Sequence, residues 1–167
     1  MSHQEELISK TEAMKQIRLS IRRTALLYHY FAKTLTDTFG EEKGNELIEK
    51  AVEAYGGHIG QAARTRAIEK GRALTPQNFE SDLPELAFNS QMVKVDDEER
   101  LRVYHCPLAK VWLDLGDTKA ARLYCLVDQA KMKEFNPEYK YVHLKNILDG
   151  DPYCELVVRE DIKDKTE

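Results

Sequence analysis

The stretch YVHLKNILDGDPYCELVVR, residues 141–159, decides the fold class. Two runs rich in β-branched and aromatic residues, Tyr141–Leu148 and Tyr153–Arg159, flank the sequence Asp149-Gly150-Asp151-Pro152. Aspartate, glycine and proline in this combination are typical of a turn between two strands. The stretch therefore predicts a β-hairpin, and the charged residues 161–167 after it predict a frayed tail.

A second hairpin is predicted earlier in the chain. Gln91–Val95 and Leu101–His105 are short runs of residues that favour strands, and the acidic stretch Asp96–Arg100 separates them. The two hairpins together predict an antiparallel sheet.

The sequence between the two hairpins has a helical pattern. Leu108–Leu115 predicts a short helix with Trp112 on its apolar side, closed by a glycine. Thr118–Glu134 predicts another helix, because apolar residues recur at helical intervals until the pair Asn136-Pro137 ends the pattern.

The N-terminal part of the chain is predicted to be helical. Apolar or small residues recur every three or four positions in Glu5–Phe39, which predicts one long amphipathic helix. Glu41–Tyr55 begins with acidic residues and predicts a second helix. The pair Gly56-Gly57 is predicted to break that helix, and Ile59–Lys70 to resume it until Gly71.

A long connection, Arg72–Ser90, links the helical part to the first hairpin and shows no sustained period. It is predicted to be either a cover for a site or a crossing between two layers. The complete pattern predicts one α+β domain over residues 1–167. A helical N-terminal half (residues 1–71) packs on an antiparallel sheet built from two β-hairpins with helices between them (residues 91–160).

Composition limits the classes of function. The chain has 167 residues, of which 42% are hydrophobic and 32% charged, as in globular domains. No apolar run approaches the roughly 20 residues of a membrane span, and Met1–Thr11 is polar, so no membrane or secretory segment is expected. The net charge of -4 argues against nucleic acid as a partner. Three cysteines, an odd number, favour a reducing, cytoplasmic location.

Cys106 has the strongest chemical case of the three cysteines. Pro107 suits the first position of a helix, which puts Cys106 at the N-cap. The helix dipole and free N–H groups would there stabilise a thiolate and lower the pKa of the thiol. The alternative is a small buried side chain that only happens to precede a proline, because free cysteine is among the most buried residue types.

Other residues could contribute to the same site. Cys125 and Asp128 are three positions apart on a predicted helix, so the carboxylate could orient a base, bind a cation or transfer a proton beside the thiol. The alternative is a buried cysteine next to an exposed acid. Cys154 alternates with apolar residues on its strand and is predicted to point inward. His58, in the glycine-flanked corner, would line a pocket or lie exposed at a helix end.

Metal binding is a further alternative for the cysteines. Three thiolates and a histidine can bind zinc or an iron–sulfur cluster, but the spacings are wide and neither CxxC nor HExxH occurs. The glycine-rich dinucleotide pattern, the P-loop pattern and the GxSxG pattern are also absent. No cofactor is therefore expected, while a metal ion at the thiolates stays open.

Several short pieces of the C-terminal half occur in a specific order. They are Tyr104-His105-Cys106-Pro107-Leu108-Ala109 with Trp112, Leu123-Tyr124-Cys125 with Asp128, Phe135-Asn136-Pro137, and Gly150-Asp151-Pro152-Tyr153-Cys154. Their order and spacing resemble the L-2-amino-thiazoline-4-carboxylic acid hydrolase family. Phe39-Gly40-Glu41-Glu42-Lys43-Gly44 with Ala54-Tyr55-Gly56 is similar to the family's helical region. The resemblance therefore covers most of the chain from about residue 20 onward, except the connection 72–90.

The resemblance implies a hydrolase that opens a small cyclic amidine or amide-like ring at a C–N or C–S bond. The family's named case converts L-2-amino-thiazoline-4-carboxylate to N-carbamoyl-cysteine. The predicted catalytic residues are Cys106, Cys125, Asp128 and Cys154. The candidate substrate-binding residues are His58, His105, Tyr124, Asn136 and Asp151. Cys106 is the expected nucleophile. The alternative is direct attack on the substrate by a water molecule that Asp128 or a bound metal ion polarises.

Two other functions stay open at this point. One is a non-catalytic sensor module that binds a small ligand or a metal ion at its thiolates, and the other is a purely structural role for the cysteines. The expected partner is a small-molecule substrate, without nucleic acid or membrane. Exposed apolar positions on the first helix could also form a homo-oligomer.

Overall fold

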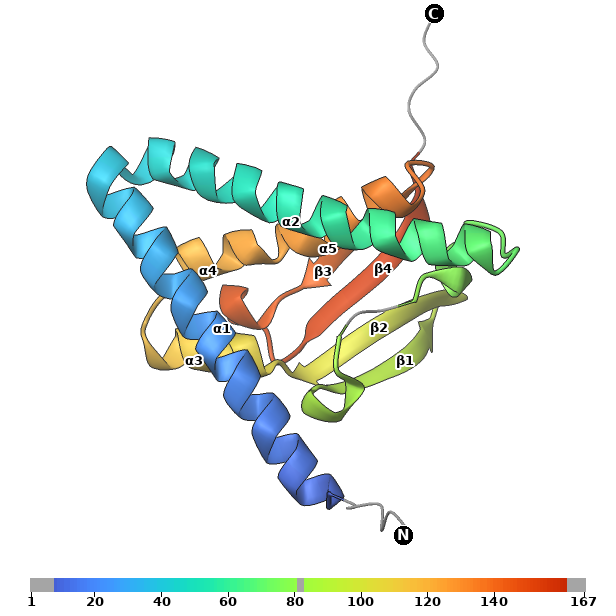
Figure 1. Ribbon diagram of the computed structural model, residues 1–167, viewed down its shortest axis with the longest axis horizontal. Helices are drawn as coiled ribbons and strands as arrows, with labels where there is room; N and C mark the ends of the chain where they lie inside the picture. Colours follow the sequence, from blue (N-terminus) through green and yellow to red (C-terminus); the bar gives the residue numbers. More distant parts are fainter. Residues whose placement is uncertain (1–7, 81–82, 162–167) are drawn as a thin grey trace, which may run out of the picture.

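Helices pack against one face of an antiparallel sheet in the computed structural model, which describes residues 8–80 and 83–161 (Figure 1). In chain order the elements are α1 (Lys10–Phe39), α2 (Glu41–Glu69), the 3₁₀ helices η1 (Pro76–Asn78) and η2 (Glu85–Ala87), β1 (Asn89–Val95), β2 (Glu98–His105), α3 (Pro107–Asp114), α4 (Lys119–Tyr124), α5 (Leu126–Phe135), β3 (Tyr139–Lys145), η3 (Ile147–Asp149) and β4 (Cys154–Glu160). The strands lie in the order β1-β2-β4-β3, and neighbours are antiparallel. The predicted α+β class and both hairpins are confirmed.

The first predicted helix is confirmed from Lys10 to Phe39. Its start lies later than predicted, because the side chain of Ser9 accepts the N–H of Glu12 at 3.2 Å and caps the helix there. Residues 5–7 of the prediction lie outside the described residues. Gly40, with a φ of 82°, separates α1 from α2, and the two helices form arms that meet at this glycine (Figure 1).

The predicted break at Gly56-Gly57 is wrong, because α2 continues through both glycines. A glycine inside a helix costs about 1 kcal/mol relative to alanine. The close packing of α5 offsets that cost. A Cβ atom on Gly56 would lie 2.7 Å from Cβ of Ala130, and a Cβ atom on Gly60 would overlap the carbonyl oxygen of Lys131. These glycines are a packing surface for α5 rather than a corner of the chain.

The helix predicted for Thr118–Glu134 is divided in two at Cys125. The N–H of Cys125 donates to the carbonyl of Arg122 at 3.1 Å, an i to i−3 bond that tightens the end of α4. Helix α5 then begins at Leu126 with its own first turn, which carries Asp128.

Both hairpins have turns that differ from the prediction. Only Asp96 and Asp97 connect β1 to β2, with positive φ angles of 50° and 64° that suit a tight hairpin turn. Strand β3 ends at Lys145 instead of Leu148. It ends there because the side chain of Asn146 accepts the N–H of Leu148 and starts the 3₁₀ turn η3.

The two hairpins join through β2 and β4. Leu101 lies opposite Leu156, and Val103 lies opposite Cys154. All four side chains line a cavity on the helix side of the sheet, so Cys154 points inward as predicted. Trp112 of α3 is fully buried on that side, as predicted, and its indole N–H donates to the backbone of α1 at 2.9 Å.

The connection between α2 and β1 contributes to the helix-facing side of the sheet. Its described residues include η1 and η2, which the sequence pattern did not indicate. Leu83 and Phe88 line the inner cavity, and Thr75 to Gln77 border a groove beside it. Within the parts of the chain that the structure describes, no helix has the length and apolar character needed to cross a membrane.

Candidate functional site

A cavity of about 130 Å³ lies between the sheet, α3 and α5, and we call it the thiol cavity. All three cysteines line it together with Asp128, so the structure brings the four predicted catalytic residues together. Further polar or amphipathic side chains in its wall are Tyr55, Tyr124, Lys131, His143 and Asn146. The remaining wall is apolar and consists of Leu83, Phe88, Leu101, Val103, Leu108, Ala109, Trp112, Val127, Leu148 and Leu156.

Cys106 is the N-cap of α3, as the proline after it predicted. Its Sγ accepts the N–H of Ala109 at 3.5 Å. The predicted lowering of its pKa is wrong, because burial raises the pKa of Cys106 to about 11 and the backbone N–H groups of Ala109 and Leu108 counteract only part of that effect. Desolvation therefore outweighs the helix N-terminus, and Cys106 is a neutral thiol at pH 7.

The other two thiols, a half-buried Cys125 and a buried Cys154, are also neutral. Sγ of Cys125 accepts from Nδ2 of Asn146 at 3.5 Å, and burial raises the pKa of Cys125 to about 12. Sγ of Cys154, at the start of β4, accepts the N–H of Ile147 at 3.4 Å, and burial raises its pKa as well. A thiol in this cavity therefore needs a base before it can act as a nucleophile.

His143 of β3 is the main residue that the sequence reasoning missed. Its Nε2 lies 3.3 Å from Oδ2 of Asp128, and its side chain is only 6% exposed. Among the described residues this Nε2 has no well-aligned hydrogen-bond partner. The sequence could have indicated His143 through the two-residue period of a strand, because Tyr139, Tyr141 and His143 are every second residue of β3 and so share one face. A buried polar atom without a partner points to a ligand position.

Asn146 fixes the orientation of the imidazole. Its Oδ1 accepts the N–H of Leu148 at 2.9 Å, so its Nδ2 must face the cavity side, 3.5 Å from Cys125 and 3.4 Å from Nδ1 of His143. Because Nδ2 can only donate, Nδ1 of His143 is the acceptor, and a neutral His143 carries its proton on Nε2, the nitrogen nearest to Asp128. The pair is thus an imidazole N–H beside a carboxylate.

Lys131 is a second residue of the cavity wall that the sequence reasoning missed. It lies on α5 one turn after Asp128 and is 5% exposed. A cation and an anion on the same helix face therefore border one small space.

The five candidate substrate-binding residues fall in different places. Tyr124 lines the thiol cavity. Asp151 does not line the cavity, and its side chain accepts the backbone N–H of Asn146 at 2.8 Å. His58 is exposed on the continuous helix α2, and His105 lies at the end of β2 opposite Asn89.

The fifth candidate, Asn136, has a local structural role. Its Nδ2 donates to the carbonyl of Leu74 at 2.8 Å, and its Oδ1 accepts the N–H of Glu138 at 2.9 Å. It therefore closes α5 and ties the following turn to the connection after α2. His58, His105 and Asn136 do not line the thiol cavity.

The described residues do not contain an arrangement of ligands that would match the alternative of a metal site. Across residues 8–80 and 83–161, no three side chains of histidine, cysteine, aspartate or glutamate are placed to hold a metal ion together. The thiols instead face backbone N–H groups and Asn146.

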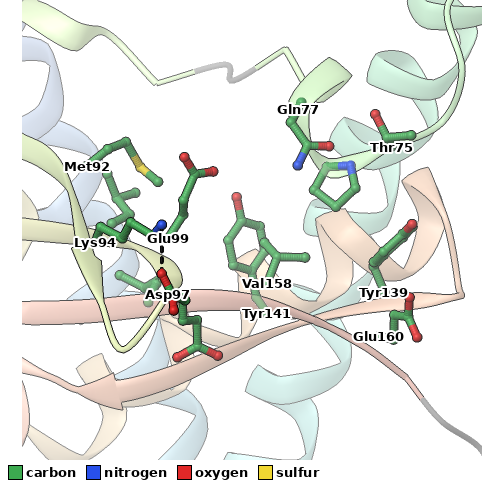
Figure 2. A pocket seen from close by; sticks show the side chains of 14 residues that line it. Thr75, Gln77, Met92, Lys94, Asp97, Glu99, Tyr139, Tyr141, Val158 and Glu160 are labelled. Atoms are coloured by element: carbon green, nitrogen blue, oxygen red, sulfur yellow. Dashed lines mark ion pairs between the residues drawn. The ribbon is translucent and has the colours of Figure 1, made fainter.

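A groove of about 820 Å³, here called the sheet groove, lies on the same side of the sheet (Figure 2). Residues Thr75 to Gln77 border it, and alternate side chains of the strands form its floor. Its strand and turn residues are Met92, Lys94, Asp97, Glu98, Glu99, Leu101, Tyr139, Tyr141, Leu156, Val158 and Glu160. Leu101 and Leu156 line both the groove and the thiol cavity, so the two spaces are adjacent.

The fold and the cavity define an α+β protein with a buried thiol site. The L-2-amino-thiazoline-4-carboxylic acid hydrolase family matches residues 20–158, and the chain belongs to this family. The fold is similar to that of trafficking protein particle complex subunit 3 from Naegleria fowleri, whose crystal structure has palmitic acid covalently bound. That match has a TM-score of 0.53 and 14% identity, and covers 85% of this chain and 95% of the other. No curated protein matches the sequence.

Proposed function

We propose that the protein hydrolyses a small heterocycle whose amidine carbon is bonded to sulfur, similar to L-2-amino-thiazoline-4-carboxylate, within the thiol cavity. Membership of the family supports this class of reaction. The observation that carries the proposal is the pair of His143 and Asp128: a buried imidazole N–H without an aligned partner among the described residues faces the same space as a carboxylate and three thiols.

The size of the thiol cavity supports a small substrate. Its volume of about 130 Å³ is below the roughly 300–1,000 Å³ that is typical of sites for drug-sized ligands. A single five-membered ring with short substituents is of this order, whereas a nucleotide is much larger. The charges in the wall, Asp128 and Lys131, suit a ligand that carries both a cationic amidine and a carboxylate or amide oxygen.

The chemistry of the family's named reaction identifies the bond that breaks. In N-carbamoyl-cysteine both nitrogens remain on the former amidine carbon, and the sulfur is a free thiol. The oxygen of water therefore adds to that carbon, the bond from carbon to ring sulfur breaks, and the sulfur leaves with a proton. A C–S bond is cleaved rather than a C–N bond.

We assign the nucleophile to Cys106 and the proton transfer to Asp128. Asp128 takes the proton of the Cys106 thiol, and Sγ attacks the amidine carbon. The ring sulfur leaves and receives that proton, which leaves an isothiourea on Cys106. Water then adds to the same carbon, and Cys106 departs as a thiol while the urea forms. The N–H of His143 stabilises the Asp128 carboxylate, and the ammonium group of Lys131 donates to a carboxylate or amide oxygen of the substrate.

The experiment is a hydrolysis assay with L-2-amino-thiazoline-4-carboxylate, in which mass spectrometry detects N-carbamoyl-cysteine. Asp128→Asn and Cys106→Ser are each expected to lower kcat by about 100-fold or more. Asp114→Asn is the matched control, because Asp114 is exposed and pairs only with Lys110 among the described residues. If wild-type protein gives no product, the proposal is wrong. If Cys106→Ser keeps full activity while Asp128→Asn loses it, water attacks directly.

A non-catalytic carrier of an acyl group is the second candidate. Two observations favour it: the fold is similar to that of a protein with covalently bound palmitic acid, and apolar side chains form most of the cavity wall. One cavity thiol would displace the thiol of an acyl thioester and hold the acyl group. Incubation with palmitoyl-CoA followed by intact-mass measurement tests this function. A stable adduct that disappears in one Cys→Ser variant, without ring hydrolysis, would favour the carrier over the hydrolase.

A further inference from the structure

The sheet groove extends the thiol cavity along the helix-facing side of the sheet. Leu101 of β2 and Leu156 of β4 lie opposite each other in the strand register and border both spaces. The boundary therefore includes a pair of leucine side chains. A ligand that passes over this pair would occupy the cavity with one end and the groove with the other.

The groove is large compared with the proposed reacting ring. Its volume is about six times that of the thiol cavity. Spaces of about 300–1,000 Å³ are typical of sites for whole small-molecule ligands. Hydrolysis of a bare five-membered ring does not require this additional space.

The floor of the groove is apolar and aromatic. Tyr139 and Tyr141 of β3 and Val158 of β4 lie at its centre and at one end, and Met92 of β1 lies at the other end (Figure 2). Figure 2 shows the hydroxyl of Tyr141 pointing toward the segment that carries Gln77. Such a floor suits an alkyl or aromatic group, and the faces of tyrosine rings attract cations.

The rim of the groove is acidic. Lys94 forms an ion pair with Asp97 at 2.8 Å, and two arginines hold Glu98. Glu99 and Glu160 are exposed and form no ion pair with any residue of the described chain. In Figure 2 they lie on either side of Tyr141. This arrangement disfavours phosphates and carboxylates and favours a positively charged group.

From this geometry we infer that the substrate is bipartite. Its sulfur-containing ring reacts in the thiol cavity, and an apolar chain that ends in an ammonium or guanidinium group lies in the sheet groove, with the cation near Glu99 and Glu160. This inference rests on the proposed function and adds the chemical class of the remainder of the substrate.

The test compares two amides of L-2-amino-thiazoline-4-carboxylate, one with pentylamine and one with 1,5-diaminopentane. The amide with the terminal amine is expected to have a kcat/KM about tenfold higher, mainly through a lower KM, because two exposed carboxylates together attract its ammonium group. The double variant Glu99→Gln/Glu160→Gln should remove this ratio. Glu53→Gln, which changes an exposed carboxylate of α2, should keep it. Equal values for the two amides, or a ratio that survives the double variant, would overturn the inference.

A binding measurement separates failure of this inference from failure of the proposed function. If neither the amides nor the free carboxylate is hydrolysed, protection of the cysteines from iodoacetamide is measured instead. Stronger protection by the amine-bearing amide than by the pentyl amide, lost in the double variant, supports the groove as the site of a cationic chain. Equal protection, or none, overturns it. Hydrolysis of the free carboxylate without any effect of the chain keeps the proposed function and rejects the bipartite substrate.

Discussion

The thiol cavity and the sheet groove lie on the same face of the same sheet, but the pKa values of ionisable groups shift in opposite directions in the two regions. In the cavity, where α3 and α5 cover the sheet, burial raises the pKa values of all three cysteines. In the groove, which is open, hydrogen bonds from Arg159 and Arg100 hold the pKa of Glu98 below its ordinary value. The comparison teaches that burial under the helices raises the pKa values of the thiols, whereas arginine partners on the open part of the sheet lower the pKa of a carboxyl group.

The largest expected effect concerns the packing that holds α5 over the cavity. Gly60→Ala puts a Cβ atom against the backbone of Lys131, which cannot move without shifting α5. We expect a loss of about 3 kcal/mol or more in the free energy of unfolding, measured in urea. Gly57→Ala is the matched control, because its Cβ meets only the flexible side chain of Glu134 at 3.3 Å. Equal losses in the two variants would contradict the close packing of α5.

The next effect compares thiol reactivity in the two regions. A cysteine in the groove, introduced as Met92→Cys at a position that is 57% exposed, provides the reference for an accessible thiol. A pKa of about 11 for Cys106 leaves about 100-fold less thiolate at pH 8 than an ordinary pKa near 9. We expect iodoacetamide to alkylate Cys106 at least that much more slowly, with a rate that rises tenfold per pH unit. Similar alkylation rates for Cys106 and for the introduced groove cysteine at pH 8 would contradict a raised pKa of Cys106.

The same pKa shift predicts a loss of stability at alkaline pH. Cys106 has a higher pKa in the folded protein than in the unfolded chain, so its stabilising contribution is complete below about pH 9 and is lost as the pH rises through about 11. Cys106→Ser keeps an N-cap acceptor but does not titrate in this range. Between pH 8.5 and 10.5 the wild type should lose about 2 kcal/mol more than this variant in urea unfolding. Parallel pH profiles would place Cys106 in a solvated position.

The smallest expected effect lies at the open groove. The folded-state pKa of Glu98 is lowered by Arg159 and Arg100, so its contribution is present above the ordinary glutamate pKa and is lost as the pH falls through the lowered value. Glu98→Gln should therefore reduce the acid dependence of unfolding between pH 5 and 3 by a small amount. Added salt should reduce the difference further, because this carboxylate is partly exposed. A salt-independent difference would indicate burial instead.

Local signals in the sequence were sufficient for most of the fold. The turn residues Asp149 to Pro152 and the strand period around them predicted the second hairpin, and Pro107 predicted the N-cap at Cys106. The break at Gly56-Gly57 failed because glycine disfavours an isolated helix, whereas here it permits contact with α5. That contact depends on a helix about 70 residues later in the chain, which no local pattern reveals.

The candidate site was predictable only in part. Motif pieces indicated Cys106, Cys125, Asp128 and Cys154, and the fold brings all four into one cavity. His143 was missed because its approach to Asp128 depends on the strand order and on where α5 crosses the sheet. The direction of the pKa shift at the helix N-cap was also wrong, since it depends on how deeply the thiol is buried rather than on its neighbours in sequence.

The contact between α2 and α5 also has a consequence for the range of ligands that the protein can accept. Gly56 and Gly60 do not line the thiol cavity, yet they set how closely α5 approaches α2, and α5 carries Asp128 and Lys131 into the cavity wall. Larger residues at these positions would displace α5 relative to the sheet and change the width of the cavity. We therefore expect relatives that differ at these two glycine positions to accept substrate rings of a different size, although neither position lines the cavity.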